Sequence, residues 1–287
     1  MKKRINDRKL LSYPLKTRLN NTFLFGILCV SSLVMLFPFY WAITNSVKIE
    51  QFIYASPPQW FPNPITLKNY FAVFKQVPFL KFFLNSIIVA TCITISNVFF
   101  DTLAAYAFAK LKFPGRDVIL FILLTSLMVP MQVNLIPLYR IINSLKWLDT
   151  YLALIVPFMT SITGIFLLRQ FMQSIPDEIL ESARLDGCSE FGIFSKIVFP
   201  LSRPGVATLV IITFMDAFNS FLWPRLVTNS ADMYTLQVGL TQLQQRYSSN
   251  VGTVMAGTVL TMLPLILVFL LMQNQFIEGM TAGAVKQ

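Results

Sequence analysis

Residues 82–100 read FFLNSIIVATCITISNVFF and contain no charged side chain. A stretch of about 20 mostly apolar residues is long enough to cross the hydrocarbon core of a bilayer as a helix. The rest of the chain agrees, because 55% of its 287 residues are hydrophobic, only 13% are charged, and the mean hydropathy is +0.63. A soluble domain carries about 25% charged residues. The sequence therefore predicts an integral membrane protein.

Five further apolar stretches resemble residues 82–100 in length and composition. Together they predict an all-α protein with six transmembrane helices, in a permease domain at 19–277, with spans at about 20–44, 82–104, 118–139, 150–169, 205–227 and 253–275. Asp216 interrupts the fifth span near its middle. Six spans place both ends of the chain on the same side of the membrane.

Basic residues give the orientation. Seven of the 23 Lys and Arg residues lie in residues 1–18, directly before the first span. Because basic residues in short loops stay in the cytoplasm, the N-terminus is predicted to be inside. Fifteen basic residues then lie in cytoplasmic segments and eight in outer loops, which predicts an N-in, C-in protein with a cytoplasmic tail at 278–287. The net charge of +10 thus reflects topology and not a nucleic-acid partner.

Composition also excludes several classes of enzyme. The chain has no His, so it cannot form a His-based catalytic triad or a His-ligated metal or haem site. No Gly is followed by Lys, so the phosphate-binding loop G-x4-G-K-[ST] is absent and nucleotide must bind elsewhere. The three Cys residues show no disulfide framework.

The segment 170–204, between the fourth and fifth spans, differs from its surroundings because it holds five of the 13 acidic residues. Ser174 is predicted to cap a helix with Ile175, Ile179 and Ala183 on one apolar face. Gly187 is predicted to end this helix. The segment after Gly187 has Phe191, Phe194 and Val198 at helical spacing before Pro200 and Pro204. Such a cytoplasmic helix-turn-helix could bind a soluble partner or fold back on its own bundle.

At these residues the sequence resembles a known family. Glu181-Ser182-Ala183, followed by Gly187, Ile197 and Pro200, is similar to the EAA-x3-G-x9-I-x-L-P signature of permease subunits of bacterial ABC importers. Ser182 and Phe199 depart from it. Further stretches resemble the sugar-type permeases, similar to the second membrane subunit of the maltose importer; they are 137–139, 164–170, 218–224 and 279–286.

The resemblance implies a permease subunit in the bacterial cytoplasmic membrane, without catalytic activity or a cofactor of its own. Its implied partners are a second permease subunit, two ATPase subunits that bind ATP and Mg, an extracytoplasmic solute-binding protein, a sugar or polyol, and membrane lipid. The 170–204 loop would dock into the ATPase and couple its closure to alternating access. The residues carried over to this contact are Glu181, Ser182, Ala183, Arg184, Asp186, Gly187, Phe191, Phe194, Ile197 and Pro200.

Polar residues within the spans are candidates for the solute pathway. A charged residue such as Asp216 is costly in a bilayer, so it should face a cavity or a partner. Asp216, Asn219 and Trp223 would share one helical face, which suits a hydroxyl-rich solute, although Asp216 could instead bond another helix and Trp223 could only pack. Asn85 and Asn134 are weaker candidates, as are Asn97 and Gln132.

Two alternatives remain open from the sequence. An ion-coupled secondary transporter could use Asp216 and Asp101 as coupling charges, but it leaves the 170–204 loop unexplained. An ABC permease could also carry a non-sugar solute, such as an amino acid or a phosphorylated polyol. By analogy with the maltose system, the outer loop 228–246 would reach the binding protein.

Overall fold

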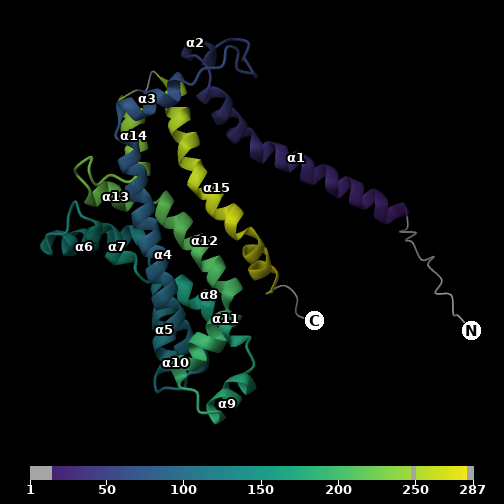
Figure 1. Cartoon of the computed structure of the whole chain (residues 1–287), viewed down its shortest axis with the longest axis vertical. Coiled ribbons are helices and arrows are strands. Elements are labelled where there is room, and N and C mark those ends of the chain that lie inside the picture. The colour runs from purple at the N-terminus through teal and green to yellow at the C-terminus, as the bar shows by residue number, and fades with distance from the viewer. Residues whose placement is uncertain (1–14, 247–249, 283–287) are drawn as a thin grey trace, which may run out of the picture.

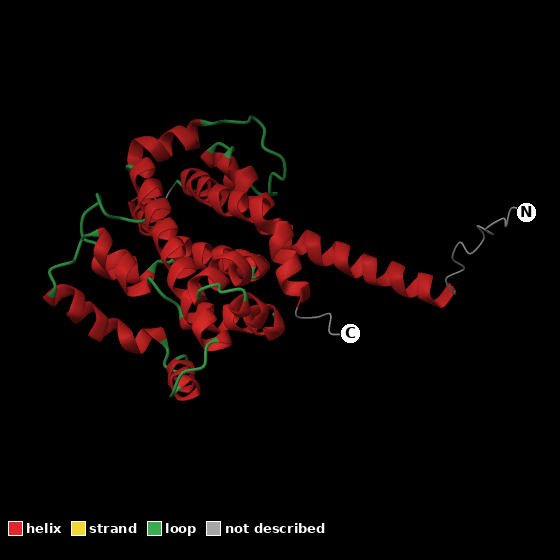
Figure 2. Ribbon diagram, turned by 60° about the horizontal axis from the view of Figure 1, so that its bottom comes forward, coloured by secondary structure: helices red, strands yellow, loops and turns green. Residues whose placement is uncertain are grey.

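The computed structural model describes residues 15–246 and 250–282, and all the regular structure in them is helical (Figure 2). The helices are α1 (Leu15–Ser46), α2 (Glu50–Ile53), α3 (Lys68–Gln76), α4 (Phe79–Lys110), α5 (Arg116–Ser126), α6 (Met131–Ser144), α7 (Tyr151–Ile155), the 3-10 turn η1 (Val156–Phe158), α8 (Ile162–Gln173), α9 (Asp177–Leu185), α10 (Glu190–Ile193), the π-helical turn η2 (Phe194–Val198), α11 (Phe199–Leu201), α12 (Arg203–Asn219), α13 (Leu222–Val227), α14 (Leu236–Arg246) and α15 (Val251–Ala282).

The helix α4 lies at the centre of the helical bundle (Figure 1). It packs against α12 and α8, and α12 in turn packs against α15. The α9–α11 segment lies at one end of α4, and α3 with α14 lies near the other (Figure 1). The packing of α4 against α8 and α12 forms the core of the bundle.

Four helical stretches among the described residues are long and apolar enough to cross a membrane: Thr22–Ser46, Phe79–Lys110, Tyr151–Gln173 and Val251–Leu271. Two bent pairs bring the number to six if each pair is one span. The range of four to six spans agrees with the membrane fold predicted from the apolar stretches.

Two of the predicted spans bend or break sharply, and a third, 150–169, is divided into α7, η1 and α8. The 118–139 stretch bends by 98° between α5 and α6, and the predicted helix over 205–227 ends at Asn219. Pro224 explains the second break, because its ring clashes with the carbonyl four residues earlier and it donates no hydrogen bond. That carbonyl belongs to Ser220, which has extended backbone (φ −60°, ψ 128°).

The helix α1 extends away from the rest of the chain and meets it near its C-terminal end, beside α15 (Figure 1). Its apolar side chains are exposed, with Phe25 at 68% and Met35 at 72%. Such exposure fits a helix surrounded by lipid or by another subunit. Just after α1, at the start of α2, the carboxylate of Glu50 accepts hydrogen bonds from the amides of Val251 (2.9 Å) and Gly252 (3.1 Å). These bonds cap the N-terminus of α15.

Residues 1–14 of the predicted N-terminal segment 1–18 lie outside the described residues. Residues 283–287 of the predicted tail 278–287 also lie outside them.

Candidate functional site: the α9–α11 loop and a cavity between α4, α8 and α12

The segment predicted as a cytoplasmic helix-turn-helix does form two helical pieces joined at Gly187. The helix α9 begins at Asp177 after Pro176, with Asp177 and Glu178 in its first turn. The prediction that Ser174 caps it is wrong, because the Ser174 hydroxyl donates to the carbonyl of Phe171 (2.7 Å) at the end of α8. The N-cap position of α9 is Pro176, so Ser174 lies two residues too early in the chain to cap this helix.

Gly187 makes the turn between the two pieces. Its φ is +83°, a left-handed conformation that residues with a side chain rarely adopt. The amide of Gly187 donates to the carbonyl of Arg184 (3.0 Å), and the amide of Cys188 donates to that of Ala183 (3.0 Å). This pair of bonds is the Schellman arrangement that ends a helix.

The loop buries one face and exposes the other. Leu180, Ala183, Phe194 and Val198 are buried against the ends of α4, α8 and α12. The predicted apolar faces were therefore only partly right, because Ile179 is 43% exposed and Phe191 is 69% exposed. The buried face of α9 therefore contains Leu180 in place of Ile179, and the buried face after Gly187 contains Phe194 and Val198 without Phe191.

The exposed face of the loop carries most of the predicted contact residues. Glu181, Ser182, Arg184, Asp186, Gly187 and Phe191 are exposed, whereas Ile197 and Pro200 are half-buried. Ala183 and Phe194 face the core. Sequence analysis missed Leu185, which is 89% exposed between Arg184 and Asp186. Exposed Leu185 and Phe191 give this face apolar side chains suited to contact with another protein.

Two polar clamps tie the loop to the end of α4. The ammonium of Lys110, whose side chain is only 3% exposed, donates to the carbonyl of Ile175 (2.5 Å) and to the carboxylate of Asp177 (2.6 Å). The hydrogen bond from Lys110 and its positive charge hold the pKa of Asp177 below its usual value. The Tyr106 hydroxyl donates to Glu190 (2.6 Å), which also accepts from Arg184 (2.7 Å). The loop and α4 are therefore expected to move together.

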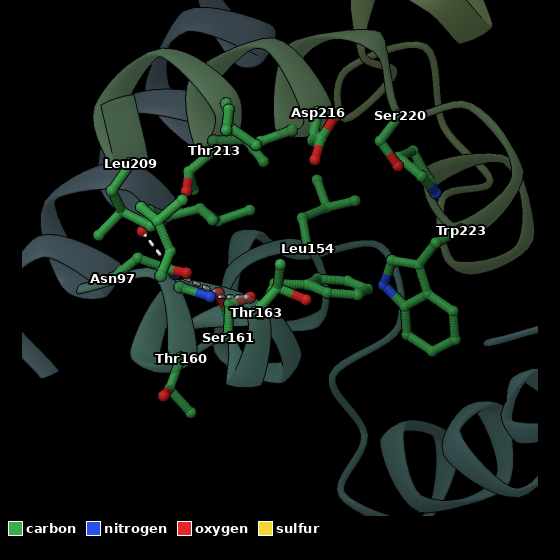
Figure 3. A pocket seen from close by; sticks show the side chains of 18 residues that line it. Asn97, Leu154, Thr160, Ser161, Thr163, Leu209, Thr213, Asp216, Ser220 and Trp223 are labelled. Atoms are coloured by element: carbon green, nitrogen blue, oxygen red, sulfur yellow. Dashed lines mark hydrogen bonds between the residues drawn. The ribbon is translucent and has the colours of Figure 1, made fainter. Parts of the chain in front are cut away.

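A cavity of about 370 Å³ lies farther along the bundle, between α4, α8 and α12 (Figure 3). Apolar side chains, including Leu154, Leu209 and Trp223, form much of its wall. The Trp223 indole nitrogen donates to the carbonyl of Ala153 (2.9 Å), and its ring lies edge-on to that of Phe158 at 6.0 Å. Trp223 is thus a fixed, 4% exposed part of the wall.

Polar groups face the cavity from two sides. Thr213, Asp216 and Ser220 lie along one wall, and Thr163 lies across from them on α8 (Figure 3). The side chains of these four residues form no hydrogen bond or ion pair with another described residue. They remain available to a bound molecule. Thr163, Thr213 and Ser220 were not predicted, although Thr213, Asp216 and Ser220 recur at i, i+3 and i+7.

Of the weaker candidates, Asn97 lines the cavity, but its amide nitrogen donates to the carbonyls of Ile93 (2.9 Å) and Phe158 (2.7 Å) (Figure 3). The other predicted pathway residues lie elsewhere. Asn219 is exposed outside the cavity and accepts from Gln237 (3.2 Å). Asn134 is exposed on α6. Asn85 is 3% exposed, and its amide binds the carbonyls of Asp232 and Tyr234 (2.8 and 2.9 Å) while accepting from Tyr151 (2.6 Å). These bonds hold the segment 232–234 against α4 and occupy both polar atoms of the Asn85 side chain.

Asp101 lies behind the cavity wall and joins α4 to the start of α8. Its fully buried carboxylate accepts from the Thr160 hydroxyl (2.7 Å) and the Ser161 amide (3.1 Å). A Cβ on Gly164 would lie 2.4 Å from the same carboxylate, so only glycine allows this approach. Asp101 is therefore satisfied by protein groups alone.

A comparison with known protein families supports the membrane fold and the family resemblance of the α9–α11 loop. Residues 101–281 match the family described as the binding-protein-dependent transport system inner membrane component, and the chain belongs to this family. It is accordingly a non-catalytic, multi-pass permease subunit of an ABC importer in the inner membrane, and ATP is hydrolysed on a separate subunit. Membership argues against the alternative of an ion-coupled transporter.

Relatives and a solved structure resemble the chain along most of its length. The arabinooligosaccharides transport system permease protein AraQ of Bacillus subtilis (strain 168) is 35% identical over 89% of this chain and 92% of that protein. The sn-glycerol-3-phosphate transport system permease protein UgpE of Escherichia coli O157:H7 is 34% identical over 86% and 91%. A bacterial ABC transporter involved in the import of the acidic polysaccharide alginate contains a chain with the same fold, with a TM-score of 0.81, 22% identity and coverage of 93% and 99%.

Proposed function

We propose that the chain imports a sugar, an oligosaccharide or a sugar-like polyol, as one of two different permease subunits. It would cross the membrane six times with both ends in the cytoplasm. Two ATPase subunits would bind ATP and Mg on the cytoplasmic side, and an extracytoplasmic binding protein would deliver the solute. The family match over residues 101–281 carries this proposal.

The carbohydrate class is supported by the relatives and by the cavity. AraQ is named for arabinooligosaccharides and UgpE for a phosphorylated polyol. The free hydroxyls of Thr163, Thr213 and Ser220 suit a solute rich in hydroxyl groups. The apolar wall around Trp223 suits the C–H faces of a sugar ring. We assign Asp216 and Trp223 to the solute pathway on this basis.

The exposed face of the α9–α11 loop is proposed as the contact with the ATPase. Glu181, Arg184 and Asp186 would supply charged groups, and Leu185 and Phe191 would supply apolar area. The clamps from Lys110 and Tyr106 would pass any movement of the loop to α4, which also forms a wall of the cavity. ATP binding would then supply the free-energy difference between the two orientations of the cavity.

The Gly187→Val variant tests the contact. A β-branched residue at φ +83° is strained by about 1–2 kcal/mol, which distorts the turn on the exposed face. We expect the ATPase to be lost when the chain is purified through a tag, and Glu181→Lys to have the same effect.

Gly26→Ala is the matched control, because a Cβ at Gly26 would meet nothing within 4 Å. All three variants should reach the membrane in similar amounts. If Gly187→Val and Glu181→Lys both retain the ATPase as fully as Gly26→Ala does, the loop is not the contact.

A further inference from the structure

Asp216 gives the cavity a negative charge that no cation among the described lining residues balances. It is the one ionisable residue among those that line the cavity in the described part of the chain, and none of the others is Lys or Arg. Its carboxylate forms no ion pair or hydrogen bond with another described residue. Behind the wall, the carboxylate of Asp101 accepts hydrogen bonds from Thr160 and Ser161, and an acidic group supplies no positive charge to balance Asp216.

The surroundings of Asp216 strengthen its effect. Apolar walls such as those around Leu209 and Leu154 have a low dielectric constant and concentrate the field of a charge inside a cavity. Thr213 and Ser220 flank Asp216 on the same side of the cavity, and Thr163 faces it (Figure 3). Neutral hydroxyls can bind a neutral solute, but they cannot compensate the charge of an anion.

We infer that Asp216 is a charge filter, which makes the cavity favour neutral or cationic hydroxylated solutes over anionic ones such as phosphorylated or uronic sugars. The inference rests on the proposed function, in which this cavity is the solute pathway. The charge filter would select solutes by charge within the membrane, in addition to the selection made by the binding protein. Asp216 is thereby a specificity-determining residue.

Charged thiol reagents test the filter without knowledge of the cargo. Cys29, Cys92 and Cys188 are replaced by Ala, so that the residue introduced by Thr213→Cys is the single thiol of this chain. The small soluble thiol 2-mercaptoethanol serves as the reference for each reagent. The chain is purified with its partner subunits, and the rates of modification by a cationic and an anionic methanethiosulfonate of similar size are measured. Thr163→Cys, on the opposite wall, replaces Thr213→Cys if that variant does not assemble.

Residues three apart on a helix have Cβ atoms about 5–6 Å apart, so a charge at 216 should strongly affect a thiol at 213. We expect the ratio of cationic to anionic rates at the cavity thiol to be roughly tenfold or more above that of 2-mercaptoethanol. Asp216→Asn should abolish this excess, whereas Asp117→Asn, at an exposed carboxylate on α5, should leave it unchanged. That result would establish the filter.

The two remaining outcomes are distinct. If the cavity thiol reacts at similar rates with both reagents, or if Asp216→Asn changes nothing, the filter is refuted while the pathway stands. If thiols at both 213 and 163 resist both reagents with and without ATP, the cavity is not an aqueous pathway, and the filter fails together with that part of the proposed function.

Discussion

Replacing Lys110 by Met is expected to release the α9–α11 loop from α4. Met keeps most of the volume of the buried side chain but removes the ammonium that binds the Ile175 carbonyl and the Asp177 carboxylate. A hydrogen bond involving a charged group contributes about 1.5–3 kcal/mol. The ion pair adds at most about 1 kcal/mol, because Asp177 is 73% exposed and regains water. The variant should therefore lose about 2–3 kcal/mol of local stability.

Hydrogen–deuterium exchange of the α9 amides measures this loss. A change of 2–3 kcal/mol corresponds to roughly 30- to 150-fold faster opening. Asp177→Asn is the matched control, because it removes only the exposed ion pair, and it should accelerate exchange by about fivefold at most. Equal exchange in the two variants would refute the argument that the buried bond from Lys110 holds the loop.

Asp101→Asn should destabilise the chain by about 1–3 kcal/mol, because an amide cannot accept all the bonds that Thr160 and Ser161 donate, and thermal denaturation in detergent should show a fall of several degrees. Asp117→Asn, at a residue with a 76% exposed side chain, should change little, and equal shifts in the two variants would contradict the role of Asp101. The lowered pKa of Asp177 means that its contribution is present above its unfolded pKa of about 4 and is lost as the pH falls through the folded value. Exchange in α9 should thus accelerate on acidification in the unmodified chain relative to Asp177→Asn; identical pH profiles would exclude this linkage.

The sequence predicted the membrane character and the loop because both depend on patterns within short stretches. Residues 82–100 lie inside α4, and Gly187 does end α9. The break before α13 was missed because the apolar pattern continues through it, although Pro224 was a signal that a helix could not include Ser220. Local patterns do not show how an apolar stretch is divided.

The cavity was harder to predict because a threonine within a span has two possible roles. Thr94 and Thr208 donate to the carbonyl four residues earlier on their own helices, whereas the hydroxyls of Thr163 and Thr213 are free. Sequence does not distinguish the two cases, since the difference depends on which face meets a neighbouring helix. The bonds of Asn85 could not be predicted for the same reason: its partners, in residues 232–234 and Tyr151, are distant in sequence.

Purification from the native host can show whether this chain is the permease subunit of an ATP-driven importer. The chain would be tagged, extracted in mild detergent and analysed for bound proteins by mass spectrometry. We expect a second, different permease subunit and an ATPase in stoichiometric amounts, and a loss of the ATPase alone with Gly187→Val. Recovery of the chain alone or as a homo-oligomer in several mild detergents would contradict the account.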